Sequence, residues 1–212
     1  MYSERYIEVT AGPPGGFVGE PSRIPIIKPE LLSELMQVEP SGDKRTIEYR
    51  PCQVTLTDGA VRDHVYVVEA ISYIGTWGVW PWEDCAKSSL SILDVKNIRS
   101  SPSRLPVRLA NKLYARGETS MGGISYGLAL RDGRTINVSG GDAVDFPAYP
   151  AGVGADDVVG LCEWKGPTQD FVGTAPYFWC LFCLEPDATQ TYLENFAQSL
   201  ARSRVQWRLM PE

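Results

Sequence analysis

Residues 103–147 read SRLPVRLANKLYARGETSMGGISYGLALRDGRTINVSGGDAVDFP and hold the most regular pattern in the chain. In their first part a leucine recurs at every fourth position, at Leu105, Leu109 and Leu113. This spacing aligns apolar side chains along one face of a helix. We expect the helix to begin at an N-cap Ser103 and to stop at Gly117, because serine caps helix N-termini and glycine ends helices.

The same stretch continues into a hairpin whose two strand-like runs meet at Asp132-Gly133. Asp58-Gly59 joins two similar runs within residues 52–68. Asp-Gly supplies the positive φ angles of a tight hairpin turn. Because a loop of aromatic, proline and acidic residues and then a short strand follow each hairpin, residues 46–102 and 118–170 form a candidate pseudo-repeat. Chance recurrence of Asp-Gly hairpins in a β-rich domain is the alternative, and the simpler one.

Working outward, the remaining elements are less regular. We expect strands at 5–9, 90–95, 177–184 and 205–210, helices at 29–36 and 188–203, and an aromatic loop at 75–84. The sequence therefore predicts an α+β fold, with mainly antiparallel sheets built from the two Asp-Gly hairpins and packed with two or three helices. We expect residues 1–45 to form an irregular N-terminal segment with a strand and a helix, and 46–212 to form one compact core.

Composition places the chain among ordinary globular proteins, since 43% of its 212 residues are hydrophobic and 22% are charged. The net charge of −6 argues against binding to nucleic acid, because phosphate contacts require lysine and arginine. The absence of a long apolar stretch argues against a membrane span. We see no secretory signal and an odd number of cysteines, five, and therefore expect a cytoplasmic protein with reduced cysteines.

The charge is unevenly distributed along the chain. Residues 71–141 carry a net charge of +4, and residues 142–187 carry −7. The acidic part offers candidate binding residues for a basic protein partner, namely Asp142, Asp145, Asp156 and Asp157. Their spacing does not match a calcium-binding EF-hand, so we expect no metal site. A basic row, Arg104, Arg108, Lys112 and Arg116, is expected on the wet side of its helix, where the acids of the same chain could neutralise it.

Three tryptophans within six residues, Trp77, Trp80 and Trp82, are the sharpest candidate for an interaction surface. Tryptophan is enriched at binding hot spots because it supplies a large rigid area at little entropic cost. Glycine and proline between them favour a loop. The alternative is that these indoles cap one end of the core.

Candidate catalytic groups are weak. His64 is the only histidine, and alternation along a strand is expected to point Asp63 away from it. Cys180 and Cys183 have the spacing of a zinc or redox pair, but they lie in a buried strand pattern that faces them to opposite sides of a sheet. The glycine-rich turn at 121–123 follows a helix and precedes a strand, the reverse of a phosphate-binding loop, and neither it nor the turn at 139–142 has the lysine of such a loop. We therefore expect no cofactor.

Together these features favour a non-enzymatic cytoplasmic protein that acts by protein–protein binding. An inhibitor or immunity-type antitoxin would use the acidic surface against a basic partner. Two alternatives stay open. One is an enzyme that uses the loop carboxylates Asp142 and Asp145 near Glu118, and the other is a carbohydrate- or peptide-binding module that uses Trp77, Trp80 and Trp82.

Overall fold

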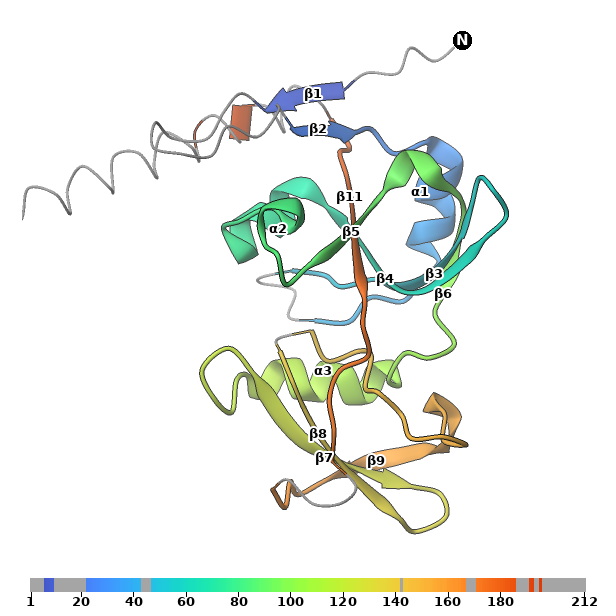
Figure 1. Ribbon diagram of the computed structural model, residues 1–212, viewed down its shortest axis with the longest axis vertical. Coiled ribbons are helices and arrows are strands. Elements are labelled where there is room, and N and C mark those ends of the chain that lie inside the picture. Colours follow the sequence, from blue (N-terminus) through green and yellow to red (C-terminus); the bar gives the residue numbers. More distant parts are fainter. Residues whose placement is uncertain are drawn as a thin grey trace, which may run out of the picture.

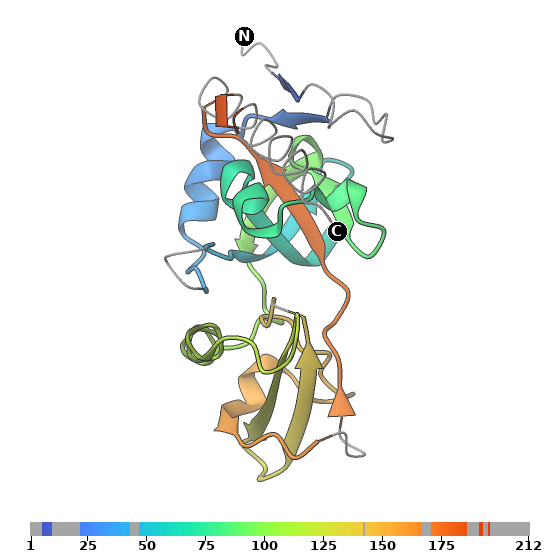
Figure 2. The same cartoon turned by 90° about the vertical axis from the view of Figure 1, so that its left-hand side faces the viewer.

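The computed structural model describes residues 6–9, 22–42, 47–141, 143–166, 171–185, 191–192 and 195. The chain forms two lobes, each built around its own sheet, and it passes between the lobes along two connections (Figures 1 and 2). The α+β fold is confirmed, and most strand pairs are antiparallel. The expected 188–203 helix and 205–210 strand lie almost wholly outside the described residues.

The first lobe is built on a five-stranded sheet in the order β5-β11-β4-β3-β6. Its members are β3 (Pro51–Leu56), β4 (Val61–Glu69), β5 (Ser88–Ser91), β6 (Val95–Ser100) and β11 (Phe178–Phe182). β11 runs parallel to both of its neighbours, and the other pairs are antiparallel. The most apolar run of the chain therefore becomes an inner strand covered on both sides. A separate pair, β1 (Tyr6–Val9) and β2 (Ser22–Pro25), adjoins this lobe.

Two helices cover the two faces of the first sheet. α1 (Pro29–Met36) buries Leu31 and Leu35 in the cluster that lines one face, and it has the bounds expected from the sequence. α2 (Ala70–Trp77) buries Tyr73 and Ile74 in the cluster on the other face. The side chain of Glu69 caps α2 by accepting the N–H of Ser72 at 2.9 Å. The expected aromatic loop is therefore partly helical.

The second lobe carries a four-stranded sheet in the order β10-β8-β7-β9. Its members are β7 (Ile124–Leu130), β8 (Thr135–Gly140), β9 (Val158–Cys162) and β10 (Phe171–Val172). α3 (Val107–Arg116) packs its leucine row on one face, and all three leucines of the expected row are buried. Gly117 ends α3 with a positive φ of 78°.

The start of α3 differs from the expectation. The helix begins at Val107, with Pro106 as the N-cap residue, because Ser103 is engaged elsewhere. The Ser103 hydroxyl donates a hydrogen bond to Asp63 Oδ2 at 2.7 Å, across the junction between the lobes. The cap signal at Ser103 is thus a contact between distant segments rather than a helix start.

Both sheets use one pairing register around their Asp-Gly hairpins. Val54 pairs with Arg62 and Ile98, and Leu128 pairs with Ile136 and Leu161 in the same way. The resemblance extends to irregular positions. Thr57 N donates to Asp94 O at 2.8 Å, and Arg131 N donates to Asp157 O at 2.8 Å. The pseudo-repeat stays a candidate, with chance recurrence as the simpler alternative, and the two hairpins share this hydrogen-bond register.

The first hairpin differs from the second in one irregularity. Between Cys52–Val65 and Val54–Arg62 the register of β3 and β4 shifts, so that Gln53 faces both Asp63 and His64. His64 has a φ of 57°, the left-handed conformation that accompanies such bulges. The bulge brings Asp63 Oδ2 to 3.9 Å from His64 Nε2, so the expectation that alternation separates these side chains is wrong.

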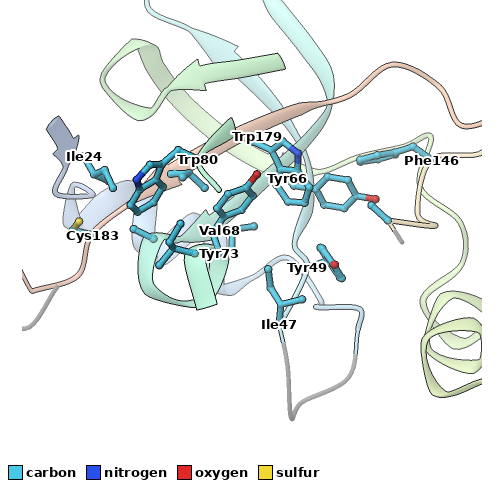
Figure 3. Packing of buried hydrophobic residues seen from close by; sticks show 14 residues of the cluster. Ile24, Ile47, Tyr49, Tyr66, Val68, Tyr73, Trp80, Phe146, Trp179 and Cys183 are labelled. Carbon is cyan, nitrogen blue, oxygen red and sulfur yellow. The ribbon is translucent and has the colours of Figure 1, made fainter. Parts of the chain in front are cut away.

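A chain of aromatic rings joins the two lobes. Phe146 from the second lobe packs on Tyr66 with ring centroids 4.8 Å apart, and Tyr66 stacks on Trp179 at 5.0 Å. Tyr73 meets the same indole edge-on at 5.0 Å. Figure 3 shows this cluster running from Phe146 at one end to Trp80 and Ile24 at the other. The lobes therefore share one buried core across their junction.

Candidate functional site

The three candidate tryptophans divide between the interior and the surface. Trp77 ends α2 and packs, half-buried, against the aromatic cluster. Trp80 is only 7% exposed. Trp82 is 44% exposed, in the short 3-10 helix η1 (Pro81–Glu83). The core-cap alternative therefore describes Trp80, whereas Trp82 is available for contact.

A rigid local structure holds Trp82 at the surface. Pro81 fixes the backbone at the first position of η1, and Glu83 Oε2 accepts the N–H of Trp80 at 3.3 Å. The indoles of Trp80 and Trp82 stack with centroids 5.2 Å apart and an interplanar angle of 8°. Because the ring is already ordered, the Trp82 side chain loses little conformational entropy when a partner packs on it.

A shallow pocket of about 180 Å³ adjoins Trp82. Its wall is polar and apolar in about equal parts, and the lining residues are Ile24, Pro25, Trp82, Ser89, Leu90, Ser91, Trp179 and Leu181. Three of these residues belong to β5, which is an edge strand of the first sheet. The pocket thus lies where an open strand edge meets an exposed aromatic side chain.

The charges beside Trp82 are partly paired. Lys87 Nζ lies 3.4 Å from Asp84 Oδ2 and 4.2 Å from the centroid of the Trp77 ring. The N–H of Ala86, followed by Lys87, lowers the pKa of Asp84. Glu83 is exposed, and its one described contact is with the N–H of Trp80. The local surface therefore keeps a net negative charge.

The four acidic candidates do not share one surface. Asp156 is exposed, and Asp157 is half-buried and accepts the N–H of Gly154 at 2.9 Å. Asp142 lies outside the described residues. Asp145 is fully buried, so it cannot contact a partner directly. Its burial corrects the interpretation of residues 142–157 as a single acidic face.

Asp145 instead accepts hydrogen bonds from three hydroxyl groups. Ser41 Oγ donates to Oδ1 at 2.5 Å, and the phenols of Tyr114 and Tyr66 donate to Oδ2 at 2.7 and 3.3 Å. Arg104 Nη2 lies 3.9 Å from Oδ1. Burial raises the pKa of Asp145, and these donors and the Arg104 charge oppose the rise. The side chain therefore links segments of both lobes.

The basic row is divided between the interior and the surface of the molecule. Arg104 is 7% exposed and donates to Glu39 O at 2.6 Å, so its expected place on the wet side is wrong. Arg108 donates to Val159 O at 2.8 Å, and Arg116 donates to Ser125 O at 2.7 Å. Lys112 is exposed. Arg104 therefore contacts the junction, and Arg108 and Arg116 bind backbone of the second lobe from exposed positions.

Of the loop carboxylates in the enzyme hypothesis, Asp145 is buried and Glu118 is exposed, and Asp142 lies outside the described residues. The pocket beside Trp82 is not lined by Asp145 or by Glu118, and Glu118 Oε2 accepts the N–H of Gly122 at 3.2 Å in an exposed turn. At the bulge, Ser103 donates to Asp63 rather than to His64, so no serine–histidine pair forms. Within the described residues, no group of acids, cysteines and histidine is arranged to hold a metal ion.

The five cysteines are free thiols. Cys180 and Cys183 pack into different clusters on the two faces of the first sheet, which confirms the expectation that they point apart. Burial raises the pKa of the Cys52 thiol to about 12. Burial also holds the pKa of the Cys180 thiol well above its usual range. These buried thiols are therefore poor nucleophiles.

No known protein family, curated protein or solved structure matches this chain. None of the described helices has the length and apolar character needed to cross a bilayer. The site at Trp82 must therefore be interpreted from its own chemistry.

Proposed function

We propose that this chain is a non-enzymatic binding protein that contacts a protein partner through the Trp82 edge of the first sheet. The observation that carries the proposal is a pre-ordered, exposed indole beside a pocket of mixed polarity, at a strand edge that no other described strand covers. Rigid aromatic anchors next to pockets are where binding energy concentrates in protein interfaces. Among the three expected tryptophans, Trp82 is the one that offers this combination.

The partner is expected to carry a basic segment. The chain has a net charge of −6, and the surface next to Trp82 keeps the exposed carboxylate of Glu83. Complementary charge raises association rates and selects partners. An inhibitor or immunity-type protein that meets a basic toxin surface is one form of this function, and it predicts a steep loss of affinity with added salt.

The test uses random linear peptides displayed as a library and selected on the immobilised full chain. Enriched peptides are then titrated against wild type, Trp82→Ala and Trp164→Ala. Trp164 is a matched control because it is also exposed, at 39%, but lies in the second lobe after β9. Removing a hot-spot indole costs about 2 kcal/mol or more of binding free energy. We therefore expect Trp82→Ala to lower the affinity for the peptide at least roughly 30-fold.

Two outcomes contradict the proposal. One is equal affinity of wild type and Trp82→Ala for every enriched peptide. The other is failure to enrich peptides together with Trp82-dependent binding to a glycan array, which would make the surface a carbohydrate site.

A further inference from the structure

β5 forms the edge of the first sheet that contains no charged residue and no proline. One side of Ser88–Ser91 pairs with β11, and in the described part of the chain no strand pairs with the other side. Natural edge strands are protected by charged residues, proline or bulges. The opposite edge, β6, has such protection in the exposed Lys96 and Arg99. β5 carries three serines and a leucine instead, and its serines are exposed.

The pocket is placed to accept a side chain from a strand paired with β5. Ser89, Leu90 and Ser91 line it, so it borders the strand along most of its length. In an added strand, alternate side chains point to the same face of the sheet. A volume of about 180 Å³ admits one large apolar side chain and excludes a folded element. Trp82, Trp179 and Leu181 supply apolar contact for that side chain, whereas the side chain of Leu90 packs on the other face of the sheet.

The charge of Glu83, which follows the pocket residue Trp82, favours a particular residue beside the inserted apolar side chain. Glu83 is exposed and belongs to η1, which packs beside β5. Asp84 is already paired with Lys87. A lysine or arginine next to the apolar anchor would therefore find one unpaired carboxylate, whereas an acidic residue there would be repelled.

We propose that the partner contributes an extended segment that adds to the first sheet at β5, inserts one apolar side chain beside Trp82 and places a basic residue near Glu83. This inference rests on the proposed function, because it specifies how the partner is held at the same surface. Backbone hydrogen bonds to β5 supply part of the affinity, and the pocket and Glu83 supply specificity.

The test scans the tightest selected peptide by methylating one backbone nitrogen at a time. A paired strand uses the N–H of alternate residues, so we expect losses of at least 10-fold at every second position and little change between them. Methylation acts on the peptide, so the fold of the protein is untouched. Hydrogen exchange of the complex should show new protection of the Ser88–Ser91 amides.

A second arm tests the charge. Glu83→Gln should weaken a peptide with a basic flank, and the loss should shrink when that flank is replaced by glutamine. The strand-addition proposal is overturned if binding depends on Trp82 but is insensitive to methylation and leaves β5 exchange unchanged, and that result leaves the proposed function standing. If binding does not depend on Trp82, the proposed function itself fails.

Discussion

The phenol of Tyr114 and the carboxylate of Asp145 form a buried hydrogen bond of 2.7 Å at the junction between the lobes. The N–H of Val144 donates to the same phenol oxygen at 3.2 Å, so the single hydroxyl proton is free to point at Asp145. The Tyr66 phenol has the same arrangement, since it accepts the N–H of Asp145 and donates to the carboxylate. Burial and the carboxylate raise the pKa of both phenols, which therefore keep the protons they donate.

Replacing Tyr114 by phenylalanine removes one donor from the buried carboxylate and one acceptor from Val144. Leaving buried polar groups unsatisfied costs about 1–3 kcal/mol, so Tyr114→Phe should lower the free energy of unfolding by that amount. Tyr149→Phe is the matched control, because the Tyr149 hydroxyl is buried without a hydrogen-bond partner. Urea denaturation measures both variants. Equal stabilities would show that the Asp145 contacts contribute nothing.

The raised pKa of Asp145 predicts how stability varies with pH. Native Asp145 holds its proton to a higher pH than the 3.8 of an ordinary aspartate. As the pH rises from the ordinary aspartate pKa toward the raised pKa of native Asp145, the unfolded chain releases the proton and the native chain keeps it. The contribution of Asp145 to stability therefore falls with rising pH, at most by about 1.4 kcal/mol per pH unit.

Asp145→Asn isolates this contribution. Denaturation from about pH 4 to pH 7 should show a shallower fall for the variant than for wild type, whatever its overall stability. The comparison concerns the slope, because the amide also loses acceptor capacity toward Ser41, Tyr66 and Tyr114. Parallel curves for the two proteins would mean that the native pKa of Asp145 is not raised.

The burial of the cysteines predicts their order of alkylation. Cys85 is exposed, whereas Cys52, Cys180 and Cys183 are buried. Because the thiolate is the reactive form and the Cys52 pKa is raised to about 12, native protein at mildly alkaline pH should be labelled first at Cys85. Mass spectrometry after iodoacetamide treatment checks this. Labelling of Cys52 before denaturant is added would contradict its burial.

Gly127 predicts a steric limit in the second sheet. A Cβ at this position would lie 2.6 Å from Cys162 Sγ and 2.8 Å from Glu163 O, so the chain after β9 leaves no room for a side chain. Gly127→Ala should lower the free energy of unfolding by about 1–3 kcal/mol, as overpacking of a core does. Gly160→Ala is the control, because its Cβ would meet no atom within 4 Å and its φ is not positive. Thermal unfolding of the two variants should separate them clearly.

Local signals predicted the elements that depend only on neighbouring residues. The bounds of α1, the Asp-Gly turns, the leucine face of α3 and its end at Gly117 follow from helix caps, turn chemistry and apolar spacing. The strand at β11 follows from its continuous apolar run. α2 does not follow from these signals, because Gly75 and the tryptophans favour a loop, whereas the Glu69 side chain caps a helix.

Pairing between distant segments decided the rest. No local pattern shows that β11 inserts between β4 and β5 as a parallel strand, or that a bulge brings Asp63 to His64. For the candidate site, the sequence marked the three tryptophans and the acids. Only packing showed that Trp82 is exposed and Trp80 is not, and that β5 borders the pocket.

Residue types and their spacing along one segment are enough to predict the α+β class, the two hairpins and the short list of surface candidates. The tertiary structure alone decided the environment of each candidate. Asp145 looked like a surface acid until Ser41, Tyr66, Arg104 and Tyr114 converged on it from positions up to 104 residues away. The burial and charge state of a side chain depend on what surrounds it in space, and for Asp145 every one of those partners is distant in the chain.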